Sequence, residues 1–418
     1  MSKFRLAHLG LLAALLGATI APVFVGASTA YAAETTLRPE LGKPLQGAID
    51  DIKKGKYKEA LGKVHEAEAV GGTRTPYENY MVEFIRASAA QGAGENELAA
   101  KSFEAVISSG YLTGAAQTKM ILTLGELHYR ASEYPKAIVW LTRYLSEGGD
   151  DPNVRSLLIN AYYGNNEFAR AGKEVSAQIQ ADEKAGRTPS DQQLQMLASC
   201  AIKLNDKAGY VAAVEKMVTY HPKKELWQDL LNKLENKQGF NDSRLGLDVF
   251  RIRMAVGAVT TSNDYMNMAE LAIQAGYPTE AKKVIDAAFK SGAFGAGTEA
   301  ARQKRLQDLA VKKEAEDQKT LAQTEAEVAK GKDGTGLVNL GYDFITMGQF
   351  DKGIALMEQG IEKGDLKHPD DAKLHLGMAY LQADKKAKAL QMFKTVQGND
   401  GTLELAHFWM ILANHPVN

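Results

Sequence analysis

The sequence predicts an all-α chain, an α-solenoid in which helix-turn-helix units stack side by side. Three observations predict this fold class. Apolar residues recur three and four positions apart, as on one face of an α-helix. The pattern returns about every 34 residues along most of the chain. Beyond the N-terminal segment, no convincing run alternates between apolar and polar residues as a half-buried strand does.

The composition is that of a folded protein with almost no net charge. Of the 418 residues, 45% are hydrophobic and 24% are charged, and 50 basic residues face 51 acidic ones. This balance excludes extensive disorder, and the single cysteine excludes a disulfide scaffold. A net charge of −1 gives no reason to expect nucleic acid as a partner. The length would suggest two or three globular domains, but a repeat array does not follow that expectation.

The N-terminal residues 1–32 have the pattern of a cleavable signal peptide. Lys3 and Arg5 precede an apolar stretch from residue 6 to 27, and small residues follow it. Ala30 and Ala32 fit the small-x-small rule of signal peptidases, which predicts cleavage after Ala32 and a periplasmic or secreted protein. The alternative is an uncleaved membrane anchor, because the apolar stretch is about long enough to span a bilayer.

The repeat is clearest at a recurring leucine, which glycine follows in three of four units. Leu124 and Leu158 lie 34 residues apart and open segments that superpose without a gap, and Leu340 and Leu376 open two more at a spacing of 36. The four best-matched units begin near Gln117, Pro152, Gly334 and Asp370, and weaker ones cover 41–72, 76–110, 189–222, 224–256 and 263–292. We therefore expect roughly nine to eleven helix pairs.

Small and aromatic residues at matching positions indicate how the helices approach one another. Gly125, Gly341 and Gly377 fall in mid-helix, where glycine costs about 1 kcal/mol relative to alanine, so we expect a second helix to pass close to each. Alanines stand at the matching position of the second helix: Ala60, Ala99, Ala137, Ala171, Ala281 and Ala389. Four aromatics are expected to fill the space between paired helices: Tyr57, Tyr134, Phe168 and Phe350.

This pattern resembles the tetratricopeptide repeat, a 34-residue helix-turn-helix, over most of the chain after the signal. The resemblance implies a right-handed superhelix with a concave groove that binds a peptide or protein partner. In this family the contacts come from the first helix of each repeat, two, five and six positions after the leucine. The implied groove residues are Glu126, Tyr129, Arg130, Asn160, Tyr163, Tyr342, Ile345, Met378 and Leu381.

Residues 298–336 depart from the repeat and separate the array 33–297 from a C-terminal part, 337–418. Residues 298–330 are densely charged and contain no glycine or proline. Their length keeps the repeat in phase, which favours a degenerate repeat of two polar helices over one long bridging helix, and residues 331–336 form a glycine-rich hinge. The last helix, about 402–414, is apolar nearly all round, so it either tucks into the array or docks another chain.

No catalytic, cofactor-binding or metal-binding motif is present in the sequence. Cys200 lies in an apolar helical run and reads as a buried hydrophobic residue. The pairs Asp150-Asp151 and Asp370-Asp371 precede helices and are expected to cap them. The leading hypothesis is a non-catalytic scaffold of the periplasm or secreted space, with a role in cell-envelope assembly. The alternatives are a membrane-tethered assembly factor and, less favoured, a solenoid cell-wall hydrolase.

Overall fold

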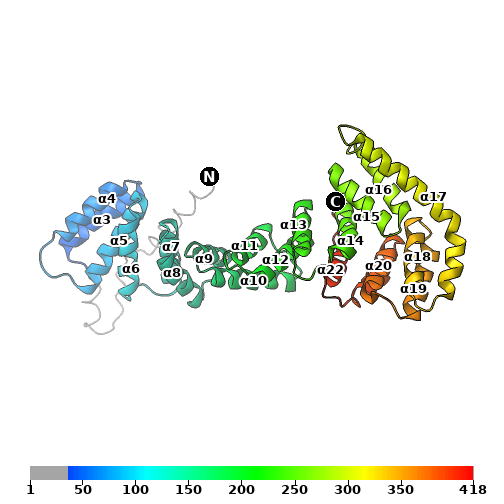
Figure 1. Cartoon of the computed structure of the whole chain (residues 1–418). Helices are drawn as coiled ribbons and strands as arrows, with labels where there is room; N and C mark the ends of the chain where they lie inside the picture. The colour runs from blue at the N-terminus through cyan, green and yellow to red at the C-terminus, as the bar shows by residue number, and fades with distance from the viewer. Residues whose placement is uncertain (1–35, 418) are drawn as a thin grey trace. The chain divides into compact units, whose positions relative to one another are not determined.

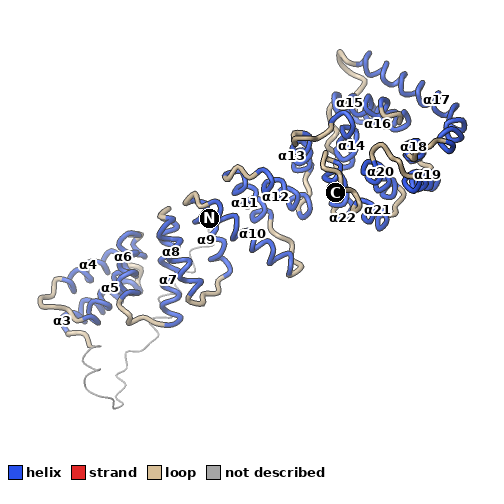
Figure 2. Tube along the Cα trace, turned by 60° about the horizontal axis from the view of Figure 1, so that its bottom comes forward, coloured by secondary structure: helices blue, strands red, loops and turns tan. Residues whose placement is uncertain are grey.

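The computed structural model describes residues 36–417, which form 20 helices and no strands (Figures 1 and 2). Eighteen of these helices are nine consecutive pairs, one for each unit that the sequence predicts. The pairs are α3 (Pro39–Lys53) with α4 (Tyr57–Glu68), α5 (Pro76–Ala93) with α6 (Asn96–Ser108), α7 (Gly114–Arg130) with α8 (Tyr134–Ser146), α9 (Pro152–Gly164) with α10 (Phe168–Lys184), α11 (Asp191–Lys203) with α12 (Lys207–Tyr220), α13 (Lys224–Glu235) with α14 (Asp242–Ala255), α15 (Ser262–Gln274) with α16 (Pro278–Ser291), α18 (Thr335–Thr346) with α19 (Phe350–Lys363), and α20 (Pro369–Gln382) with α21 (Lys386–Phe393).

The chain divides into two compact units, which we call unit 1 (up to residue 178) and unit 2 (from residue 179). The domain limits at 297 and 336 stay predictions. The predicted signal peptide lies outside the described residues. Within the described part of the chain, no helix combines the length and the apolar character that crossing a membrane requires.

The turn inside a pair has the same geometry in eight of the nine pairs. One residue adopts a left-handed conformation, as Ser132 and Asn166 do with φ of 60° and 61°, and the next N–H reaches back five residues. Glu133 N, for example, donates to His128 O at 2.9 Å. This is the Schellman arrangement that ends a helix and satisfies its last carbonyls. The left-handed residues are Gly55, Gly94, Ser132, Asn166, Asn205, Gly276, Gly348 and Asp384.

The mid-helix glycines lie where a neighbouring helix passes, as predicted. A Cβ added at Gly125 would be 2.8 Å from Leu141 Cδ2, and one at Gly377 would be 2.3 Å from the Phe393 ring. At Gly341 a Cβ would meet the carbonyl oxygen of Gly353 at 2.7 Å, so backbone packs against backbone between α18 and α19. The six alanines at the matching positions are fully buried. Cys200 is buried too, and burial raises the pKa of its thiol.

The charged segment is a single helix, α17 (Ala300–Lys330), so the two-helix interpretation favoured by the phase is wrong. No glycine or proline interrupts it, and ion pairs one turn apart join side chains on its exposed face, such as Lys304 with Asp308 at 3.1 Å. Its buried residues are Gln303, Leu306 and Ala310, on the side that packs against α15, α16 and α18.

The last helix, α22 (Thr402–Asn414), is tucked into unit 2 and does not form a free docking surface. Phe408 is 1% exposed and its ring lies 6.0 Å from that of Trp227 on α13. Leu405 and Ala406 are fully buried. The helix contacts α20 and α21, which precede it, and also α12 and α14, which lie far back in the sequence (Figure 1). Unit 2 is therefore closed by contacts between its early and late helices.

Candidate functional site

The groove residues predicted in unit 1 lie on the first helices α7 and α9 and are accessible. Glu126, Tyr129, Asn160 and Tyr163 are partly exposed, and Arg130 is exposed. The Arg130 guanidinium donates to Glu126 Oε2 at 3.1 Å across one helical turn. Each tyrosine packs edge-on against the aromatic residue that opens the second helix of its pair, with Tyr129 5.8 Å from Tyr134 and Tyr163 5.1 Å from Phe168.

A larger aromatic group on α5 was missed from the sequence. Tyr77, Tyr80 and Phe84 follow one another at spacings of three and four on this first helix, and Tyr111 joins them from the turn before α7. The ring of Tyr80 lies 5.3 Å from that of Tyr111 and 5.9 Å from that of Phe84. Burial raises the pKa of Tyr80, while Tyr111 is exposed. The spacing was the available signal, in a unit that matches the repeat pattern weakly.

A cavity of about 360 Å³ opens in unit 1 between α6, α7 and α8. Its lining includes the charged or polar side chains of His128, Glu133 and Lys136, which contact one another. His128 is 3% exposed, and its Nδ1 lies 2.6 Å from Glu133 Oε2. The hydrogen bonds from His128 and Lys136 hold the pKa of Glu133 below its usual value. These contacts brace the turn between α7 and α8, and no set of three metal-ligating side chains occurs among the described residues.

In unit 2 the predicted groove residues lie in the core. Tyr342, Ile345 and Met378 are 1%, 1% and 2% exposed, and Leu381 is partly buried. The Arg251 guanidinium stacks over the Tyr342 ring at 4.6 Å, a cation–π contact in a dry environment. Three of the four predicted contact positions of unit 2 are therefore not accessible to a partner in this structure, and Leu381 is accessible only in part.

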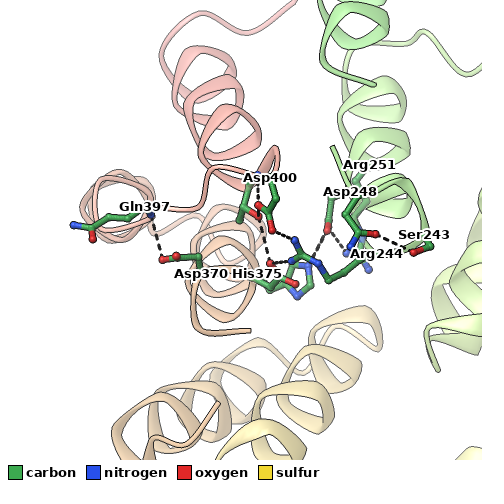
Figure 3. Close-up of polar contacts among 11 residues, drawn as sticks. Ser243, Arg244, Asp248, Arg251, Asp370, His375, Gln397 and Asp400 are labelled. Atoms are coloured by element: carbon green, nitrogen blue, oxygen red, sulfur yellow. Dashed lines mark hydrogen bonds and ion pairs between the residues drawn. The ribbon is translucent and has the colours of Figure 1, made fainter. Parts of the chain in front are cut away.

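Arg251 also belongs to a cluster of paired charges between α14 and α20 (Figure 3). Asp248 accepts from Arg251 Nη1 at 2.7 Å and lies 3.0 Å from His375 Nε2. The other guanidinium nitrogens of Arg251 donate to both oxygens of Glu280, at 2.9 and 2.6 Å. Burial opposes the ionisation of Asp248, but His375 and Arg251 together hold its pKa at about 2.

Arg244, one turn before Asp248, joins α14 to two later segments. Its guanidinium pairs with Asp371 at the start of α20 and with Asp400 just before α22 (Figure 3). Asp400 also accepts from the Thr402 hydroxyl at 2.7 Å.

The capping role predicted for the acidic pairs holds for Asp151, which accepts from the N–H of residue 153 at 2.8 Å. Asp371 lies inside the first turn of α20 and makes the ion pair with Arg244.

Because the charges of this cluster are engaged with one another, it holds distant helices together. A removed partner would leave a buried charge unpaired, which typically costs several kcal/mol, so the cluster fixes the closure of unit 2.

Two carboxyl groups also meet across α17 and α18. Asp343 is 4% exposed, and Asp317 faces it from α17 with a buried Oδ2 that has no hydrogen-bond partner. Burial, and then the neighbouring Asp317 carboxyl, raise the pKa of Asp343 to about 7. Burial and the Asp317 carboxyl therefore both favour the protonated form of Asp343.

The family model described as "Tetratricopeptide repeat" matches residues 84–153 and 338–402. The resemblance predicted from the sequence is confirmed for these two segments. No curated protein matches the chain.

Several solved structures are similar to the chain at low identity. The TPR2AB domain of yeast Sti1 in complex with pHSP90 is 13% identical, over 71% of this chain and 99% of that one, with a TM-score of 0.24. Yeast Tom70 is 11% identical, over 89% and 95%, with a TM-score of 0.22. Naa15/Naa10 bound to HypK-THB is 13% identical, over 87% of this chain and 65% of that one, with a TM-score of 0.31.

Proposed function

We propose that this chain, whose segments 84–153 and 338–402 are tetratricopeptide repeats, is a non-catalytic scaffold that binds a peptide or protein segment. One observation carries the proposal. The first helices α5, α7 and α9 of unit 1 present accessible aromatic and polar side chains, whereas three of the four groove positions predicted in unit 2 are buried. Stacked helix pairs offer extended binding surfaces, and aromatic side chains dominate the energetics of such interfaces.

Site-specific photo-crosslinking tests where the partner binds. A benzophenone side chain replaces Tyr80 or Tyr129 on the first helices, and Val139 on the second helix α8 serves as control because it is 62% exposed. We expect the same partner to be captured from Tyr80 and Tyr129 and not from Val139. Equal capture from all three positions, or turnover of a cell-wall substrate by the purified chain, would contradict the proposal.

Binding by the purified partner then measures the contribution of the tyrosines. Tyr129→Ala and Tyr163→Ala are each expected to weaken binding about 5- to 30-fold, as loss of an aromatic contact of about 1–2 kcal/mol does. Val139→Ala, at an exposed position of the second helix α8, is the control and leaves the affinity unchanged.

We also propose that the scaffold acts in the periplasm or secreted space, in assembly of the cell envelope. The N-terminal pattern of basic, apolar and small residues supports this location. Mass spectrometry of the protein recovered from the producing cells tests it. A chain that begins at Ala33 agrees with export, and a chain that retains Met1 would favour the membrane-tethered alternative.

A further inference from the structure

We propose that the cavity between α6, α7 and α8 in unit 1 binds a small organic cation, an alkylammonium or alkylguanidinium group. Its lining residues differ from the groove residues of the proposed function, so neither inference depends on the other. Three features of the cavity carry the proposal: an unpartnered imidazole nitrogen, an excess of carboxylates and an apolar wall. The volume of about 360 Å³ lies at the lower end of the range of ligand pockets, so the cavity suits a ligand of a few heavy atoms.

The imidazole ring of His128 has one nitrogen that is held and one that is not. Nδ1 lies 2.6 Å from Glu133 Oε2. Because an ionised carboxylate only accepts hydrogen bonds, Nδ1 carries the proton, and Nε2 of the neutral ring is an acceptor. Nε2 has no hydrogen-bond partner among the described residues, although the side chain is only 3% exposed. A buried acceptor without a donor is costly, so a donor from outside the chain would stabilise it.

A second acceptor lies next to that nitrogen. Oε1 of Glu104, on α6, is 3.5 Å from His128 Nε2, and both side chains line the cavity. Two neighbouring acceptors suit a group with several N–H donors, which an ammonium and a guanidinium both have. The Glu104 side chain is 44% exposed, and an exposed side chain changes rotamer quickly, so it can move aside to admit the ligand.

The charges of the lining also favour a cation. The lining contains three glutamates and two lysines: Glu97, Glu104, Glu133, Lys101 and Lys136. One negative charge therefore remains when the His128 ring is neutral. Lys136 is engaged by Glu133 at 3.0 Å, and Lys101 is exposed and forms no ion pair with a described residue, so neither lysine fills this place. A monovalent cation with N–H groups balances the charge and supplies the donor that Nε2 lacks.

Apolar side chains form another part of the wall. Leu127 and Ala100 are buried, and Ala131 lines the cavity beside them. A short alkyl chain can lie against these residues while its charged end stays at the carboxylates, as the stems of lysine and arginine do. Both a free alkylamine or guanidine and the basic side chain of a peptide present this chemistry.

Ligand titrations of the full chain, followed by NMR of the histidine ring nitrogens, test the proposal. The His128 signals are assigned by their loss in His128→Gln. At about pH 8, where an ordinary imidazole is neutral, we expect Nδ1 to be protonated and Nε2 to be free. The Nε2 signal should shift when n-butylammonium or n-butylguanidinium binds, and n-butylurea, a neutral molecule of the same shape, should leave it in place.

A glycine-serine peptide with one arginine separates the two sources of the cation. Tighter binding of this peptide than of n-butylguanidinium identifies a basic side chain as the occupant, and weaker binding identifies a free amine or guanidine. Either result supports the site.

A variant of the cavity and two controls complete the test. Glu104→Gln keeps the shape of the side chain without its charge and should weaken cation binding about 10-fold or more, as loss of a hydrogen bond to a charged group does. Glu59→Gln removes an exposed carboxylate of unit 1 outside the cavity and should leave the affinity unchanged. The signals of His65, which is exposed and lies 3.6 Å from Glu68, should not move.

Four results would overturn the proposal. They are a His128 ring that carries both protons at about pH 8, an Nε2 signal that neither cation shifts at millimolar concentration, equal effects of the cations and n-butylurea, and an affinity that Glu104→Gln leaves unchanged.

Discussion

The carboxyl pair of α17 and α18 predicts that unit 2 loses stability as the pH rises through neutrality. The pKa of Asp343 is about 7 in the folded chain, against an ordinary value of 3.8. A carboxyl group whose pKa is raised by folding contributes stability that is complete below the unfolded pKa and is lost as the pH rises through the folded one. The protonated Asp343 carboxyl is therefore stabilising in acid, and its proton is lost in base.

The size of this loss of stability follows from the pH range between the unfolded and the folded pKa of Asp343. Each pH unit over which the folded carboxyl is protonated and the unfolded one is not changes the free energy of unfolding by about 1.4 kcal/mol. Between about pH 5.5 and about pH 8.5, a folded pKa of about 7 gives a loss of about 2 kcal/mol. Asp343→Asn keeps the shape of the protonated form and its ability to donate to Asp317. We expect this variant to lack the pH dependence and to exceed the wild type by up to about 2 kcal/mol in base.

Urea unfolding followed by tryptophan fluorescence measures the effect. Trp140 lies in unit 1, whereas Trp227 and Trp409 lie in unit 2, so a Trp140→Phe background reports on unit 2 alone. The exposed Asp286→Asn is the matched control and should keep the slope of the wild type. If the Asp343→Asn variant and its parent lost stability in parallel between the two pH values, the carboxyl pair would not be the source.

Three further substitutions test helix packing and one ion pair. Gly377→Ala places a methyl group 2.3 Å from the Phe393 ring and should lower the free energy of unfolding by about 1–3 kcal/mol. Gly62→Ala has open space around it and should be neutral or stabilising, so equal effects of the two substitutions in chemical denaturation would refute the close approach. Phe408→Ala should cost about 3–5 kcal/mol in the same unit 2 assay, and a loss below about 1 kcal/mol would mean that α22 is not part of the core. Glu78 on α5 is buried and accepts from Arg38 Nε at 2.8 Å, and this hydrogen bond is the main reason that its pKa is held at about 2. It therefore stabilises unit 1 above about pH 4.5, and the contribution fades as the pH falls toward 2. Glu78→Gln should reduce the loss of thermal stability in acid, and an unchanged loss would assign it to other groups.

Local rules made the repeats predictable. The glycines at 125, 341 and 377 and the alanines of the second helices follow from what two crossing helices require. The structure places each glycine against a neighbouring helix and buries each alanine. The recurring left-handed residue of the turns was harder to recognise, because glycine, serine, asparagine and aspartate share the position. Their common property is conformational tolerance and not chemical identity. The prediction of two helices over residues 298–330 was wrong because a segment of repeat length can hold either two short helices or one long one.

The closure of unit 2 could not be derived from the repeat because it depends on pairs that are distant in sequence. Arg244 meets Asp371, and Asp248 meets His375, each 127 residues away, and no local pattern marks these side chains as partners. The same closure buries Tyr342, at a position that the family resemblance assigns to the groove. A position in the repeat therefore specifies which side of the first helix a residue occupies, and the surrounding helices decide whether that side is open. In unit 1 the corresponding positions stay accessible, so the binding of a partner is to be sought on α5, α7 and α9.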